Sequence, residues 1–179
     1  MTQNLVFLCG ALRSGTSMTH LMLNAHPEIR NPGEFDFLFD LFAQNGTMPE
    51  VSDFYHFLST DRIFLSKNLR LEPNAKTYKE ALTYLIEQLE DGSNVICLNL
   101  HRNFDVAYQC FPDAQFIHMI RDPRDVSRST IGMGWAGNPY FGIKLWLKTE
   151  RNWKKLSETI ASEHIRCDSR NWSKTPTTA

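Results

Sequence analysis

The sequence predicts an α/β fold in which a central parallel sheet is flanked by helices. Three apolar runs, residues 5–9, 94–100 and 114–120, have the length and continuous hydrophobicity of strands buried on both faces. Helical patterns separate these runs, and alternating strands and helices indicate parallel strands joined by right-handed crossovers. The length of 179 residues suits one domain with a hydrophobic core.

Apolar spacing and turn residues justify the helices. Met18, Leu21 and Met22 fall at helical spacing before Pro27, which predicts a helix with an apolar face after the first strand. Residues 31–42 begin with turn residues and continue as a short helix, whereas residues 43–73 read as irregular. An amphipathic helix is expected over residues 78–92, closed by Gly92.

A long helix is expected to begin near Asn138 and Pro139, with proline in its first position. Its predicted apolar stripe consists of Ile143, Trp146, Leu147, Trp153, Leu156 and Ile160.

Composition excludes several classes of function. The formal net charge of −1 gives no general attraction for nucleic acid or an anionic membrane, so any anion site must be local. The four cysteines form no C-x-x-C pair, which favours buried reduced thiols over a disulfide framework or a zinc site. With neither a signal-peptide pattern nor an apolar stretch long enough to span a membrane, we expect a cytoplasmic protein without a membrane partner.

The stretch "GALRSGTS" after the first strand resembles the phosphate-binding pattern G-x-x-x-x-G-K-[ST], but Thr16 replaces the lysine and Arg13 lies inside the loop. Backbone N–H groups of such a loop, followed by a helix N-terminus, bind anions. Arg13 adds a permanently charged fork that suits a tetrahedral oxyanion. We therefore expect residues 13–17 to form an anion-binding site, which consists of Arg13, Ser14, Gly15, Thr16 and Ser17. The alternative is a tight turn that binds nothing.

A second motif, "IRDPRDVSRS", follows the strand at residues 114–120. Arg121 lies at the carboxyl end of that strand, where ligands bind in open α/β sheets, and Ser129 follows two helical turns later. The two side chains are therefore predicted to flank one anion. The alternative is that the arginines only solvate a helix face with Asp122 and Asp125 as partners, and we favour this for Arg124.

Together the two motifs resemble those of sulfotransferases that use 3′-phosphoadenosine-5′-phosphosulfate (PAPS), and "GMGWAGNPYFG" is similar to the bacterial branch of that superfamily. The resemblance covers about residues 4–160. It implies a P-loop-like three-layer fold and metal-free sulfuryl transfer from PAPS to a small-molecule, glycan or peptide acceptor. It assigns the 5′-phosphosulfate to the loop with Arg13, which would also stabilise charge during transfer, and the 3′-phosphate to Arg121 and Ser129.

An acceptor hydroxyl needs a base. Glu34 resembles the glutamate of tyrosylprotein sulfotransferases, and partial burial is expected to raise its pKa. Its alternative role is that of a helix N-terminal residue favoured by the dipole. His101 and Arg102 are rivals after the second strand, because cytosolic members of the family use a histidine base. Trp135 lies in a glycine-rich loop after the second motif, where the alternatives are contact with adenine or the acceptor and a place in the core or an interface. No role is assigned to it.

The chain departs from the family after the long helix, where another strand is expected. "HIRCDSRNWSKTP" loses the strand pattern, so we expect a sulfotransferase-like domain over residues 1–166 and a disordered polar tail over 167–179. A missing strand would leave a sheet edge open to self-association. Three functions remain: a PAPS-dependent sulfotransferase impaired by its short C-terminal part, a nucleotide kinase or NTPase with a degenerate loop, and a non-catalytic nucleotide-binding remnant.

Overall fold

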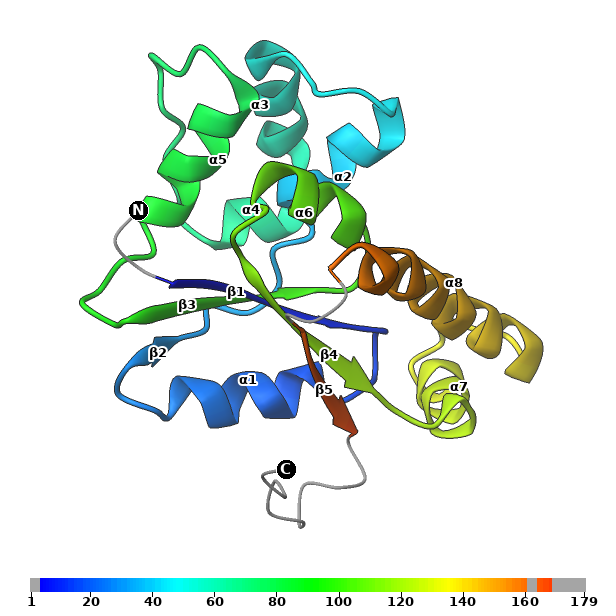
Figure 1. The fold of residues 1–179 in the computed structure, drawn as a ribbon. Coiled ribbons are helices and arrows are strands. Elements are labelled where there is room, and N and C mark those ends of the chain that lie inside the picture. Colours follow the sequence, from blue (N-terminus) through cyan, green and yellow to red (C-terminus); the bar gives the residue numbers. More distant parts are fainter. Residues whose placement is uncertain (1–3, 161–163, 169–179) are drawn as a thin grey trace.

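The computed structural model of the chain describes residues 4–160 and 164–168 and confirms an α/β fold with a central parallel sheet (Figure 1). The strands lie in the order β2-β3-β1-β4-β5, and all neighbours in this sheet are parallel. Their bounds are β1 (Asn4–Gly10), β2 (Ile29–Arg30), β3 (Val95–Leu100), β4 (Gln115–Ile120) and β5 (His164–Asp168).

Helices cover both faces of the sheet, with α1 on one face and α2 to α6 on the other (Figure 1). The helices are α1 (Thr16–Asn24), α2 (Phe37–Asn45), α3 (Val51–Thr60), α4 (Arg62–Ser66), α5 (Tyr78–Glu87), α6 (Phe104–Cys110), α7 (Pro123–Gly132) and α8 (Pro139–Thr159). The expectation of irregular structure over residues 43–73 is wrong, because α3 and α4 lie there. These short helices each bury only one or two side chains, among them Phe54 and Phe64, so their periodicity is weak.

The hydrophobic core is divided by the sheet. On β1, Phe7 and Cys9 belong to the larger cluster, whereas Val6 and Leu8 belong to a smaller one with Met119. Both faces of β1 are therefore buried, as its continuous apolar run predicts. No helix in the described part of the chain is both long and apolar enough to cross a membrane.

The predicted helix after the first strand is confirmed as α1, but its apolar side chains do not face the sheet. Met18 and Leu21 are 64% and 65% exposed, and the buried residues of α1 are Thr16 and Thr19. The Thr19 hydroxyl donates to the carbonyl of Gly15 at 3.1 Å, so it is satisfied without water. Periodicity identified an apolar stripe, but it did not show which side of the helix faces the sheet.

The prediction that a strand is missing after the long helix is also wrong. Residues His164–Asp168 form β5, in which His164 pairs with Phe116 and Asp168 with Ile120. Ile165 and Cys167 alternate with polar residues, and this short period-two pattern is sufficient once β4 supplies a partner. Residues 167 and 168, which the predicted tail contained, therefore belong to β5. Residues 169–179 lie outside the described residues.

Gly142 allows α8 to approach α7, the helix that carries the second motif. A Cβ at Gly142 would lie 2.5 Å from Ser127 Oγ and 2.8 Å from Ser127 Cα. We expect Gly142→Ala to destabilise the fold by about 2 kcal/mol, because the two backbones must separate. Urea unfolding would measure this effect. Gly132→Ala on α7, where an added Cβ meets nothing within 4 Å, is the control and should leave the midpoint unchanged or raise it slightly. Equal midpoints for the two variants would contradict the close approach.

Candidate functional site

The loop between β1 and α1 has the backbone shape of an anion cradle. Arg13 and Gly15 have positive φ values of 70° and 101°, and the chain then enters α1 at Thr16. The first N–H groups of a helix have no intrahelical acceptor, so those of Thr16 and Ser17 are available to a ligand. Together with the dipole of α1, they favour an anion at this point.

The side chains of the loop are placed differently from one another. Ser14 and Thr16 are buried, whereas Ser17 is exposed. The Ser14 hydroxyl has no hydrogen-bond partner among the described residues. An unsatisfied buried hydroxyl costs about 1–3 kcal/mol, so a polar group bound in the loop would stabilise it. These donors fit an oxyanion such as a phosphate or sulfate group.

The two sequence motifs meet at Arg13. Its Nε donates to the hydroxyl of Ser129 at 2.8 Å, and its carbonyl accepts from Nη1 of Arg121 at 2.9 Å. The guanidinium carbon of Arg13 also lies 5.8 Å from the ring centroid of Trp135. Residues 116 positions apart in the chain are thus in direct contact, and one ligand can reach both motifs.

Contacts from α8 and α7 hold Arg121 in place. The indole of Trp146 donates to the carbonyl of Arg121 at 3.1 Å, and the guanidinium lies 4.0 Å from Asp125. Asp122 caps α7 and forms a 2.6 Å ion pair with the exposed Arg124. The prediction that Arg124 solvates the helix face beside an acidic partner is therefore confirmed.

Glu34 and His101, which the sequence offered as rival bases, lie next to each other. Nε2 of His101 is 3.5 Å from Oε1 of Glu34, and the imidazole is 3% exposed whereas Glu34 is 43% exposed. A β-bridge between Glu34 and Asn99 brings the two segments together at the end of β3. Nδ1 of His101 is 2.8 Å from the carbonyl of Gly10, which ties the pair to the start of the loop.

The contacts of His101 favour a charged pair. The Gly10 carbonyl only accepts, so Nδ1 of His101 carries a hydrogen. Nε2 lies 3.5 Å from the Glu34 carboxylate and makes no hydrogen bond with a described residue, so the carboxylate favours the protonated ring through its charge. Burial disfavours the charged imidazole, but Glu34 and Asp36 outweigh that effect, so the pKa of His101 lies above its ordinary value.

The expectation of a raised Glu34 pKa is wrong. The contact with His101 outweighs the effect of half-burial, and the pKa of Glu34 falls below its ordinary value. Glu34 is therefore ionised at neutral pH.

A carboxylate network that sequence reasoning missed supports the pair. Asp36 is buried and accepts the backbone N–H groups of His101 and Arg102 at 2.8 and 3.2 Å. Asp40 holds the Arg102 guanidinium through two hydrogen bonds of 2.7 Å. Arg102 is thereby engaged in an ion pair, which speaks against its role as a base. The sequence feature that could have indicated this network is a pair of acidic residues, four positions apart, within the aromatic run "FDFLFD". Buried acidic side chains in such a run require partners.

Two cavities adjoin the pair. One of about 340 Å³ is lined by Glu34 and Lys67, and another of about 240 Å³ by His101, Leu12 and Trp135. Within residues 4–160, no group of three His, Cys, Asp or Glu side chains is arranged to hold a metal ion.

Comparison with known proteins gives the same family as the motifs. A family model described as the sulfotransferase family matches residues 5–168. No curated protein sequence matches the chain. Similar solved structures include the sulfotransferase domain of the olefin synthase of Synechococcus PCC 7002, with 16% identity and a TM-score of 0.64. Others are a sulfotransferase from Alicyclobacillus acidocaldarius (15%, 0.59) and sulfotransferase STF9 from Mycobacterium avium (15%, 0.56).

Each of these matches covers 98% of this chain but only 70%, 77% and 61%, respectively, of the other chain. At such low identity the structural likeness concerns the fold. The family match, by contrast, extends from β1 to the end of β5 and includes both motifs. The chain belongs to the sulfotransferase family.

Proposed function

We propose that the chain is a PAPS-dependent sulfotransferase that transfers a sulfuryl group to a hydroxyl or amine acceptor. The observation that carries this proposal is the contact of Arg13 with both Ser129 and Arg121. A donor with anionic groups at its 5′ and 3′ positions needs two neighbouring anion sites, and the two motifs meet here.

The residues present fit such a donor. The loop amides, Thr16 and Ser17 supply hydrogen-bond donors for the 5′-phosphosulfate, and the Ser14 hydroxyl lacks another described partner. Arg121 and Ser129 supply a cation and a hydroxyl for the 3′-phosphate. PAPS supplies an activated sulfuryl group, whose transfer requires no metal. Arg13 is positioned to stabilise the negative charge that develops on the leaving oxygen.

Glu34 serves as the acceptor base in this proposal. It is the more exposed member of its pair, so it can meet an acceptor, whereas His101 is almost completely buried. The carboxylate accepts the proton of the acceptor hydroxyl, and His101 holds it in the ionised form and in place. His101 is therefore a positioning residue.

A nucleotide kinase or NTPase is the less favoured alternative. Its loop lysine is absent, and it would require carboxylates for magnesium. The two acids at the second motif already have partners, because Asp122 caps α7 and pairs with Arg124, and Asp125 lies 4.0 Å from Arg121. A non-catalytic remnant would bind the same nucleotide without turnover, so a sulfuryl-transfer assay separates it from the enzyme.

Nucleotide titration by calorimetry tests the proposal. We expect the chain to bind 3′,5′-adenosine bisphosphate about 10- to 100-fold more tightly than 5′-AMP, as one or two charge-assisted contacts would give. EDTA should leave this preference unchanged. Arg121→Ala is expected to abolish it.

Arg124→Ala is the matched control, because Arg124 belongs to the same helix start but is 83% exposed and paired with Asp122. This variant should retain the preference. Equal affinity of the unmutated chain for both nucleotides would overturn the assignment of the second motif.

A further inference from the structure

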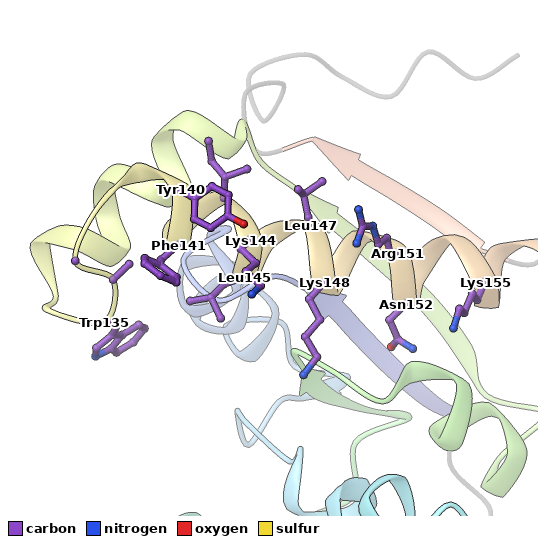
Figure 2. Close-up of a pocket in the computed structure, with 13 residues that line it drawn as sticks. Trp135, Tyr140, Phe141, Lys144, Leu145, Leu147, Lys148, Arg151, Asn152 and Lys155 are labelled. Carbon is purple, nitrogen blue, oxygen red and sulfur yellow. The ribbon is translucent and has the colours of Figure 1, made fainter.

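The largest described cavity lies along α8, beside the site. It has a volume of about 920 Å³ and is open at the surface, and no role has been assigned to it so far. Figure 2 shows its lining residues on α8 and on the preceding loop. We call this cavity the α8 groove.

One part of the α8 groove is apolar. Tyr140 and Phe141 are 70% and 51% exposed, and their rings are 5.4 Å apart. Trp135, Leu145 and Leu147 are also exposed and line the same groove. Figure 2 shows Leu147 and Leu145 on opposite sides of α8, so these two side chains lie at different edges of the groove. Exposed apolar side chains that line one cavity mark a binding site more often than scattered single residues do.

The other part is basic. Lys144, Lys148, Arg151 and Lys155 line the groove, and none of its described lining residues is acidic. None of these four cations forms an ion pair with another described residue. Their spacing of three or four positions brings like charges close on one helix, which is unfavourable unless an anion lies between them. Lys148 and Lys155 extend to the same side of α8 in Figure 2.

The α8 groove is continuous with the proposed transfer site. The 240 Å³ cavity beside His101 shares Trp135, Leu145 and Lys148 with the groove. Trp135 in turn lies under the guanidinium of Arg13. A molecule in the groove can thus extend toward both the base pair and the loop.

We infer that the α8 groove binds the acceptor, and that the acceptor is an anionic amphiphile. It would be a hydroxyl-bearing molecule with an apolar body and a carboxylate, sulfate or phosphate group. The apolar body contacts the aromatic and leucine side chains, and the anionic group pairs with the cations of α8. The acceptor role rests on the proposed function, whereas the binding preference does not.

Calorimetric titration of the full chain without nucleotide tests the binding preference. The probes are decanoate, decan-1-ol and decyltrimethylammonium, each below its micelle concentration. We expect decanoate to bind at least about 10-fold more tightly than the neutral and cationic probes, and added salt to reduce this advantage. Equal affinity for the three probes would overturn the inference.

Two variants on α8 locate the binding. Lys148→Gln is expected to weaken decanoate binding about 10-fold and to leave decan-1-ol binding unchanged. Lys154→Gln is the matched control, since Lys154 is an exposed lysine of the same helix that does not line the groove. Equal effects of the two substitutions would place the anion elsewhere and overturn the inference.

The acceptor role is measured with PAPS present. We expect 10-hydroxydecanoate to be sulfated with a kcat/KM at least about 10-fold above that of decane-1,10-diol, and Lys148→Gln to remove most of the difference. Preference for the neutral diol would overturn the acceptor class. Failure to bind 3′,5′-adenosine bisphosphate, or binding of it without sulfation of either compound, as a non-catalytic remnant would show, would instead overturn the proposed function.

Discussion

Glu34→Gln is expected to lower the turnover number by about 100-fold or more and to leave the affinity for 3′,5′-adenosine bisphosphate unchanged. Glutamine keeps the shape of the side chain but cannot accept the acceptor's proton. Glu34 lies beside His101 and lines a cavity, and it makes no described contact with the loop residues 13–17. Removal of its charge should therefore lower the rate of the chemical step and leave the donor affinity unchanged. Single-turnover kinetics and calorimetry measure the two quantities separately.

The pH dependence distinguishes the two members of the pair. Glu34 has a lowered pKa because of His101, so it remains ionised, and activity should persist, as the pH falls below about 4.5. His101→Asn retains an N–H donor for the Gly10 carbonyl and removes the nitrogen that faces Glu34. The pKa of Glu34 should then rise, and the acid limb of kcat/KM should move to higher pH.

The pair also stabilises the fold within a defined pH window. His101 has a raised pKa in the folded state, so its contribution is fully present below about 6.5 and is lost as the pH rises through the folded value. Glu34 has a lowered pKa, so its contribution is present above about 4.5 and is lost as the pH falls through the folded value. The pair therefore stabilises the fold most between about pH 4.5 and 6.5, and this stabilisation declines as the pH moves outward through either folded-state value.

Glu87→Gln is the matched control for Glu34→Gln, because Glu87 is an exposed glutamate on α5, away from both motifs. It should have full activity. Full activity of Glu34→Gln would contradict the assignment and transfer the role of base to His101.

Sequence patterns predicted those parts of the fold that depend on local chain chemistry. The apolar run before Gly10 became β1, and Asn138 caps α8 by accepting the N–H of Phe141 at 3.2 Å, with Pro139 in the first position. Features that depend on distant partners were not predictable in the same way. The strand β5 forms because β4 offers a free edge, and the orientation of α1 depends on the face that the sheet accepts.

The same distinction between local chemistry and distant partners applies to the candidate site. The sequence identified Arg13 and Ser129 separately, but their contact depends on the strand order, which places β4 beside β1. Likewise, β3 lies on the other side of β1, and this brings His101 to the Gly10 carbonyl and converts two rival bases into one pair. The α8 groove was missed because Leu147 was assigned to the apolar stripe of the long helix, whereas the structure leaves it exposed beside Lys148.

Arg13→Ala is expected to weaken binding of the donor by about 2 kcal/mol or more, and to lower kcat by a further 100- to 1000-fold. Arg13 would contact the phosphosulfate and the charge that develops during transfer, and its Nε also holds Ser129 at 2.8 Å. Arg13→Lys should restore little, because a lysine cannot present two parallel donors. Arg128→Ala, at an exposed arginine beside Ser129 on α7, is the control and should bind the donor normally.

Loss of activity through misfolding can be separated from loss of the guanidinium. Arg13 has a φ of +70°, a left-handed conformation that costs energy for a residue with a Cβ but not for glycine. Arg13→Gly should therefore be at least as stable to urea as Arg13→Ala and nevertheless equally inactive. Both variants lose the hydrogen bond to Ser129, so the comparison isolates the backbone. Unchanged donor affinity and turnover in the alanine, lysine and glycine variants would remove Arg13 from the site and, with it, the contact on which the proposed function rests.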